Sequence, residues 1–340
     1  MPIDAFNHIF PRAFVAALEK LLPDPRIVER MMSFTVLYDV EARLRLMDRF
    51  PGYRQVLAMS GPPLEAFAGP DRTPELARIA NDGLAEICAR HPDRFPAFVA
   101  ALPLDNPDAA WIELDRAVTR LGARGVQIFS NVGGRPLDRP EYFPLFERMA
   151  AFDLPILIHP ERGPSHTDYA SEAKSKYEIW FTFGWPYETS AAMARLVLSG
   201  LFDKLPAIKI VTHHMGGMTP FFEGRVGPGM DELGTRTPDE DLGPLRRALK
   251  RRPLDYFRMF YADTAVNGSK GAIRCGLDFF GIERCLFATD CPFDPEGGTT
   301  MVAASKVCSF WRKPTAPTKR SLSSTIRSRP TASKVSGMPR

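Results

Sequence analysis

The chain has 340 residues, of which 44% are hydrophobic and 25% are charged, so it is long enough to bury one large core or two moderate ones. No apolar run reaches the roughly 18 residues that a membrane span needs, and the first residues lack the basic and apolar stretches of a secretion signal. We therefore expect a cytoplasmic protein outside the membrane. Five cysteines without C-x-x-C spacing argue against a disulfide framework and a thiolate zinc site.

The formal net charge of +4 is unevenly distributed along the chain. Nine basic residues and no acidic ones follow Glu296, so in the preceding part 40 acidic residues outnumber 35 basic ones. This mildly acidic body gives no reason to expect a nucleic-acid partner.

Apolar segments alternate with amphipathic ones along the first 300 residues. In chain order we predict strand 3–10, helices 11–22 and 39–50, strand 55–60, helix 73–91, strand 95–104, helix 108–121, strand 125–130, helix 141–152, strand 154–159, helix 189–199, strand 208–212, helices 221–234 and 238–252, strand 259–264, helix 270–280 and strand 285–292. Helix 73–91 has the clearest start signal, with Thr73 as the expected N-cap and Pro74 in the first turn.

Eight strands alternating with helices predict an α/β fold with a parallel sheet, and their number matches a closed (β/α)8 TIM barrel over residues 1–300. An open doubly wound sheet is the alternative, but it normally shows a glycine-rich first turn, which residues 6–11 lack. Residues 301–340 form a basic tail rich in Ser, Thr and Pro, which we expect to be largely disordered. Met301, Ala304 and Val307 share one helical face, so a short helix is possible at its start.

Polar groups suited to metal binding or proton transfer follow several predicted strands. They are His8, His159, His213, His214 and Asp290. Because the active sites of such barrels lie at the carboxyl ends of the strands, these side chains should converge at one rim. Gly216 and Gly217 would let the backbone approach a ligand closely. The remaining histidines are expected to play other roles, His91 as a helix C-cap and His166 as a solvated loop residue.

Four of these segments, residues 4–11, 154–160, 209–217 and 286–293, resemble the amidohydrolase-related metal-dependent family. This family includes aminocarboxymuconate semialdehyde decarboxylase and the γ-resorcylate and 5-carboxyvanillate decarboxylases. The resemblance covers about residues 1–298 and is specific to the superfamily rather than to one substrate.

The resemblance implies roles for individual residues. His8, His159 and Asp290 fall on metal-ligand positions, with zinc as the expected divalent ion and manganese or magnesium as alternatives. His214 falls on the catalytic histidine, and Asp290 is a second candidate for proton transfer. Arg225 matches an arginine that binds the substrate carboxylate, in some relatives from the neighbouring subunit, which implies a homodimer. The resemblance implies that His213 either supports the metal ligands from outside or has no role in the site.

One position departs from the family pattern. The family opens with His-x-His or Glu-x-His, whereas this chain has Phe6 two residues before His8, and a phenyl ring cannot bind a cation. Three protein ligands and a water still make a catalytic zinc geometry. Metal affinity should nevertheless be lower, unless Asp4 or Asn7 contributes.

The leading hypothesis is a metal-dependent decarboxylase of a small aromatic or unsaturated carboxylic acid, because a site short of one ligand can still orient a substrate. The aromatic residues Trp180, Phe181 and Trp185 suit a planar substrate, with the two tryptophans as expected binding residues. A metal-dependent hydrolase of, for example, a lactone is the first alternative. A catalytically impaired barrel that only binds a ligand, favoured by Phe6, is the second.

Overall fold

The strands form a ring that a computed structural model describes over residues 3–22 and 28–306. A three-stranded parallel sheet contains β1 (Ile3–His8), β2 (Arg54–Ala58) and β3 (Ala97–Phe98). A six-stranded parallel sheet has the order β11 (Cys285–Leu286), β10 (Tyr261–Asp263), β9 (Ile210–Thr212), β8 (Ile156–His159), β5 (Val126–Phe129) and β4 (Ala100–Ala101). A small antiparallel hairpin pairs β6 (Asn131–Val132) with β7 (Arg135–Pro136).

Backbone hydrogen bonds join the two sheets at both seams. At one seam β3 and β4 belong to a single extended segment, in which the Val99 N–H donates to the Leu57 carbonyl at 2.9 Å. At the other, the Ala5 N–H donates to the Phe287 carbonyl at 2.8 Å and the Asp290 N–H to the Phe6 carbonyl at 3.2 Å. The ring therefore closes, which confirms the predicted (β/α)8 barrel over the open alternative.

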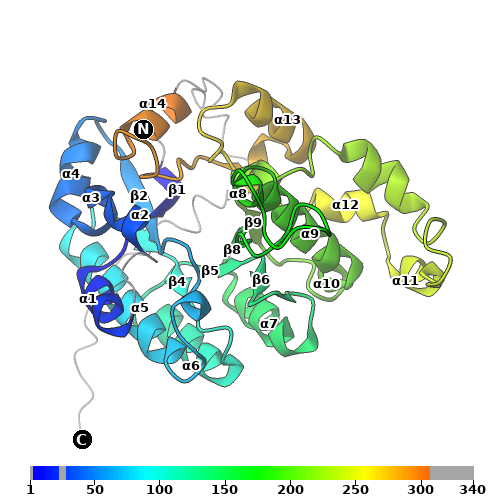
Figure 1. Cartoon of the computed structure of the whole chain (residues 1–340), viewed down its shortest axis with the longest axis horizontal. Coiled ribbons are helices and arrows are strands. Elements are labelled where there is room, and N and C mark those ends of the chain that lie inside the picture. The colour runs from blue at the N-terminus through cyan, green and yellow to red at the C-terminus, as the bar shows by residue number, and fades with distance from the viewer. Residues whose placement is uncertain (1–2, 23–27, 307–340) are drawn as a thin grey trace, which may run out of the picture.

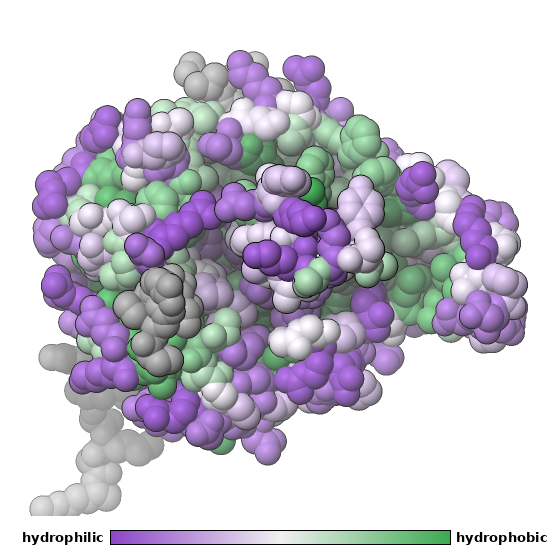
Figure 2. Space-filling view, in the orientation of Figure 1, coloured by the Kyte–Doolittle hydropathy of each residue, from purple (hydrophilic) through white to green (hydrophobic). Residues whose placement is uncertain are grey.

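Helices surround the ring (Figure 1). They are α1 (Arg12–Leu21), α2 (Glu29–Met32), α3 (Thr35–Tyr38), α4 (Val40–Asp48), α5 (Thr73–Arg90), α6 (Pro107–Thr119), α7 (Phe143–Phe152), α8 (Ile179–Thr182), α9 (Gly184–Leu198), α10 (Leu201–Lys204), α11 (Gly243–Ala248), α12 (Pro253–Phe257), α13 (Lys270–Phe280) and α14 (Thr299–Lys306). Polar side chains cover most of the face in Figure 2, and apolar ones gather towards α11, α12 and α13.

Alternation along the strands separates an inner from an outer core. On β8, Ile156 and Ile158 pack outwards against the helices, whereas Leu157 packs inside the ring. His159 has the same parity as Leu157 and so faces inwards at the end of the strand. Phe6 is buried in the inner core, and His8 follows it two residues later on the same face of β1. The alternation that places apolar side chains inside the barrel therefore also directs the site residues inwards.

Several predicted boundaries differ from the observed ones. The N-cap of α5 is Arg72, because the Thr73 hydroxyl donates instead to Asp105 at 2.7 Å, and Thr73 is the first helical residue. His91 caps the C-terminus of α5 and His166 is exposed, as expected.

The predicted helix 221–234 is confirmed over residues 223–231, where helical residues flank a π-helical turn at Arg225–Gly229. The predicted helix 238–252 is mostly wrong, because only the short α11 forms there. Pro228 and the neighbouring glycines disfavour a regular helix, although the charge pattern resembles an exposed one.

The start of the predicted tail packs on the barrel. α14 spans the expected boundary at residue 300, and Met301 and Val302 are buried. The rest of the helical face proposed for this segment, from Val307 on, lies outside the described residues, as does most of the tail. Among the residues that the structure describes, no helix is long and apolar enough to cross a bilayer.

Candidate metal centre and substrate cavity

Four side chains from different strands meet at the carboxyl end of the ring. His8 ends β1, His159 ends β8, His213 follows β9, and Asp290 follows β11. One ligand atom from each lies within 4.8 Å of those of the others. The three histidines are buried, and the Asp290 side chain is 16% exposed. The strand-end groups therefore converge as expected, but with His213 rather than His214 in the cluster.

Hydrogen bonds fix the charges in this cluster. Asp290 Oδ1 lies 3.0 Å from His8 Nε2 and 3.2 Å from His213 Nε2. Burial alone would raise the pKa of Asp290, but the hydrogen bonds from His213 and His8 hold it well below its usual range. Asp290 is therefore an anion, as a metal ligand must be.

Asp263 is hydrogen-bonded to His213 on the side of the ring opposite to Asp290. Its carboxylate lies 2.6 Å from His213 Nδ1. Burial lowers the pKa of His213, but Asp263 and Asp290 outweigh it and raise the pKa to about 9. Burial lowers the pKa of His159 well below its usual value, and the neighbouring imidazoles lower it further. The two carboxylates therefore favour a protonated His213 imidazole, and a metal ion bound at Nε2 would replace the proton on that nitrogen.

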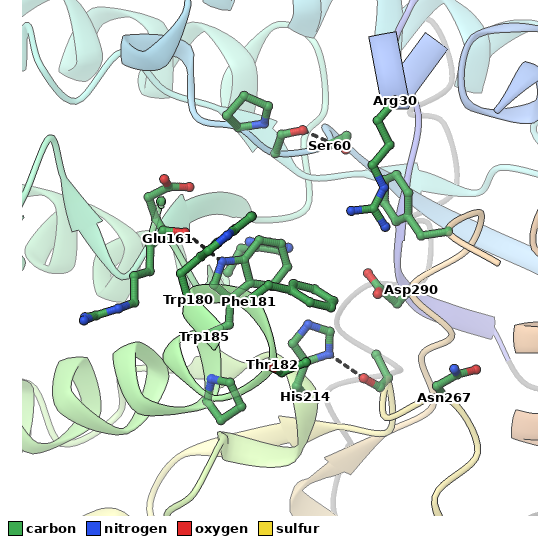
Figure 3. A pocket seen from close by; sticks show the side chains of 18 of the residues that line it. Arg30, Ser60, Glu161, Trp180, Phe181, Thr182, Trp185, His214, Asn267 and Asp290 are labelled. Carbon is green, nitrogen blue, oxygen red and sulfur yellow. Dashed lines mark hydrogen bonds between the residues drawn. The ribbon is translucent and has the colours of Figure 1, made fainter. Parts of the chain in front are cut away.

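His214 points into the cavity (Figure 3), and its ring centroid lies 3.8 Å from that of His213. Its backbone is left-handed, with φ 53°, and its N–H donates to Asp263 Oδ1 at 3.1 Å. Its Nδ1 is hydrogen-bonded to the Ala265 carbonyl, which can only accept, so Nδ1 carries the proton and Nε2 is free. Burial lowers the pKa of His214 to about 4, and His213 contributes to the shift. His214 is therefore a neutral imidazole at the cavity wall.

The cavity above these residues has a volume of about 780 Å³, which suits a small organic ligand. His159, His214 and Asp290 lie at its base, and the aromatic residues Trp180, Phe181 and Trp185 form one wall. The Trp185 ring stacks on His214 with 6.4 Å between ring centroids and an angle of 17°. Both tryptophans predicted to bind the substrate thus line the cavity.

Arg30 on α2 also lines the cavity, and the sequence analysis missed it. Figure 3 shows its guanidinium group directed into the cavity on the side of Asp290. Among the described residues no carboxylate pairs with Arg30, whereas Arg162 is paired with Glu188 at 2.7 Å. Arg30 thus offers an unpaired cation to an anionic ligand. No motif marks it, because α2 is a short helix without apolar periodicity.

Arg225 does not line this cavity. It is exposed on the π-helical turn, with its guanidinium group 6.0 Å from the centroid of the Phe222 ring. A role for Arg225 in substrate binding would therefore need the cavity of a second subunit.

Asp4 is not free to compensate for Phe6, and Asn7 is engaged in part. The Asp4 carboxylate accepts hydrogen bonds from the hydroxyls of Tyr53 at 2.5 Å and Thr289 at 2.7 Å, and so closes the seam beside β1. The Asn7 side chain donates to the Val56 carbonyl at 2.9 Å. The Asp4 carboxylate and the Asn7 amide nitrogen are thus engaged with neighbouring strands, whereas the buried Asn7 Oδ1 has no hydrogen-bond partner among the described residues.

A buried arginine supports the first strand. Arg43 is fully buried and donates to the backbone carbonyls of His8 and Val36 and to Gln55 Oε1. It therefore holds the end of β1, and with it the His8 ring, in place.

The two glycines after His214 serve packing rather than ligand approach. A Cβ on Gly217 would lie 2.4 Å from the Pro186 carbonyl oxygen, and one on Gly216 would lie 2.8 Å from the Phe280 ring. Both residues have positive φ. They let the turn after β9 sit tightly between α9 and α13, which corrects the expected role.

The donor set fits a divalent metal ion. Imidazole nitrogens and carboxylate oxygens are the usual ligands of zinc, and carboxylates also suit manganese and magnesium. The three histidines that could hold such an ion share one feature, since the Nδ1 of each has a hydrogen-bond partner on its outer side.

Comparison with known proteins identifies the family. Residues 37–307 match the model of the amidohydrolase family described as "Amidohydrolase". This chain belongs to the amidohydrolase family. It is 37% identical over 269 residues to the γ-resorcylate decarboxylase of Rhodococcus jostii, an alignment that covers 76% of this chain and 79% of the relative.

Two solved structures of amidohydrolase-type decarboxylases show the same architecture. A dihydroxybenzoic acid decarboxylase from Polaromonas, with bound manganese and the inhibitor 2-nitroresorcinol, has a TM-score of 0.71 and 30% identity and covers 90% of this chain and 93% of its own. The 5-carboxyvanillate decarboxylase of Sphingomonas paucimobilis has a TM-score of 0.74 and 27% identity, with 96% of each chain covered.

Proposed function

We propose that this amidohydrolase is a metal-dependent decarboxylase, a carbon–carbon lyase that releases carbon dioxide from a small aromatic carboxylic acid. The observation that carries the proposal is the position of the histidine and aspartate cluster at the base of an aromatic-walled cavity. The relatives that act on dihydroxybenzoate and carboxyvanillate support the substrate class.

We assign His8, His159 and Asp290 as metal ligands. A divalent ion supplies a positive charge that orients the substrate carboxylate and an adjacent oxygen. The set contains more imidazole than carboxylate, which favours zinc, although a solved relative carries manganese. The cytoplasmic location stays a prediction.

His214 is the proton carrier in this proposal. Decarboxylation requires a proton at the ring carbon that loses carbon dioxide. Asp290 is held as an anion by its hydrogen bonds, which leaves His214 as the better of the two candidates. Its Nε2, which the hydrogen bond of Nδ1 to the Ala265 carbonyl leaves without a proton, takes up a proton from solvent and delivers it to that carbon as carbon dioxide leaves.

The cavity walls position a planar anion. Trp180 and Trp185 present their rings along one wall, and a flat aromatic substrate buries its face against them. Arg30 can form a bidentate pair with the substrate carboxylate or with an adjacent hydroxyl oxygen. The carboxylate then lies between this cation and the metal ligands.

Arg225 and dimerisation belong to the same proposal. We propose a homodimer in which Arg225 reaches the cavity of the partner subunit, because it is exposed and lies outside its own cavity. Phe221, 80% exposed four residues before it, offers apolar surface for such a contact. Mixing inactive Arg225→Ala and His214→Asn chains should restore part of the activity, because some mixed dimers contain one intact site. No recovery despite mixed dimers would reject Arg225 as a shared residue.

The activity test uses metal-loaded protein with 2,6-dihydroxybenzoate and 5-carboxyvanillate. We expect carbon dioxide release in step with substrate loss. The His214→Asn chain should lose about 100-fold or more in kcat while keeping its metal, since general acid catalysis typically contributes 10²–10⁴-fold. Alkali uptake with a lactone instead of carbon dioxide release would favour the hydrolase. Tight binding without turnover would favour the binding-only barrel.

A further inference from the structure

The ring of Phe6 and the imidazole of His213 occupy one region of the barrel interior. Phe6 is 1% exposed, and its centroid lies 4.1 Å from that of His213, against 5.2 Å from His8 and 6.1 Å from His159. His213 thus lies directly on the apolar ring that β1 contributes. The imidazole that follows β9 therefore packs directly against the side chain that lies two residues before His8 on β1.

All three histidines of the cluster are oriented in the same way. Nδ1 lies 2.9 Å from the Met59 carbonyl in His8, 2.7 Å from the Pro160 carbonyl in His159 and 2.6 Å from the Asp263 carboxylate in His213. These outer acceptors hold a proton on Nδ1, so Nε2 is the atom that each ring would offer to a metal ion, which is the usual arrangement around metal-bound histidines. A carboxylate behind an imidazole also raises its strength as a ligand.

The inner nitrogens of His8 and His213 converge on one carboxylate oxygen. Nε2 of His8 and Nε2 of His213 lie 3.0 and 3.2 Å from the same Asp290 oxygen. Ligand atoms around zinc are separated by about 3.3 Å when Zn–N distances are about 2.0–2.1 Å. The four ligand atoms, all within 4.8 Å of one another, need only small side-chain rotations to reach that geometry.

We propose that His213 is a metal ligand, and that it takes the coordination position for which β1 offers only Phe6. This inference rests on the proposed metal dependence. It divides two neighbouring histidines between two tasks: fully buried His213 binds the ion, and His214, on the cavity side of a left-handed turn, moves the proton. The ligand set becomes three imidazoles and one carboxylate, with the metal open to the substrate on the cavity side.

The alternative is that His213 only balances buried charge between Asp263 and Asp290. The His213→Asn chain separates the two, because an asparagine amide can still donate to Asp263 from the Nδ1 position but offers no Nε2. If His213 is a ligand, zinc affinity should fall by more than about 100-fold, because loss of an outer partner alone costs about 10–100-fold. Asp263→Asn should give that smaller loss. His166→Asn, at an exposed loop position, is the matched control and should leave affinity unchanged.

A double variant tests whether residue 213 and residue 6 can supply the same coordination position. Adding Phe6→His to the His213→Asn chain should recover at least about tenfold of the lost affinity, because the new imidazole enters from β1. Cobalt(II) absorption spectra of each folded variant report the ligand set without relying on activity.

X-ray absorption of the zinc-loaded unmodified full-length chain counts the imidazoles directly, so the test does not depend on how the variants fold. Three imidazoles are expected. Two imidazoles in a protein that binds zinc and decarboxylates would overturn this inference and leave the proposed function standing. A chain that takes up no divalent metal would overturn both.

Discussion

Single residues set the charge of the cavity. Hydrogen bonds keep Asp290 ionised at the cavity base, and Arg30 brings a cation to the same side of the cavity. His8, His159, His214 and Asp290 could be predicted because each directly follows an apolar run, which is a local pattern. Arg30 and the place of His213 in the cluster could not, because both depend on neighbours far away in the sequence.

Replacing Arg30 should weaken substrate binding more than chemistry. Arg30→Ala removes a guanidinium that pairs with no carboxylate of the described residues, so KM for an aromatic carboxylate should rise about tenfold or more, as expected for a charged hydrogen bond of about 1.5–3 kcal/mol. The kcat should change less than KM. Steady-state kinetics at saturating metal measures both. Arg120→Ala, at an exposed position at the end of α6, is the control. An unchanged KM for Arg30→Ala would remove this residue from the substrate site.

Glu65 gives the fold a pH dependence. Burial raises the pKa of Glu65 to about 7, and nearby Asp105 and Glu161 contribute. In the unfolded chain this carboxyl titrates near 4.5, so between about pH 4.5 and 7 the folded state keeps a proton that the unfolded state has lost. Its contribution to the free energy of unfolding therefore falls as pH rises through this window.

Glu65→Gln should remove that penalty. At pH 8 the variant should be more stable than the unmodified chain by about 1–2 kcal/mol, after allowance for partial solvent screening. At pH 4 the difference should vanish. Urea unfolding at both pH values measures it, with exposed Glu86→Gln as the control. A stability gain of equal size at both pH values would contradict the account.

Helices and strands could be predicted where apolar residues recur with the spacing of a helix or strand over enough residues. Helix α13 has the bounds that the sequence predicts, 270–280, because its apolar face and its Ser269 cap are both local signals. Residues 238–252 were not predictable, since tertiary contacts hold their turns. One such contact is the hydrogen bond from the Lys250 N–H to Asp203 Oδ2 at 3.1 Å.

The turn after β9, which packs against α9, should tolerate no side chain at residue 217. Gly217→Ala places a Cβ 2.4 Å from the Pro186 carbonyl at φ 63°, so backbone must move and stability should fall by about 2 kcal/mol or more. Gly133→Ala is the control, with a similar φ of 56° and open space around its Cβ. It should lose only about 1 kcal/mol from backbone strain. Equal losses in thermal unfolding would show that packing against α9 is unimportant.

The whole molecule brings distant residues together by closing the ring. Residues 8, 159, 213 and 290 meet because the carboxyl ends of all the parallel strands lie at one rim. The hydrogen bonds that Asp4 accepts from Tyr53 and Thr289 hold the first and last strands together. The eight predicted strands that alternate with helices were enough to predict this ring. It could not predict that α14 begins before residue 301 and helps line the cavity with Met301.

The central claim is that this rim holds one divalent ion at the base of the cavity. Anomalous diffraction at the zinc absorption edge, from a crystal of the full chain soaked with zinc and 2,6-dihydroxybenzoate, tests it most directly. We expect a single strong peak about 2.0–2.2 Å from the side chains of His8, His159 and Asp290. An ordered, closed barrel with no peak among these residues would contradict the account.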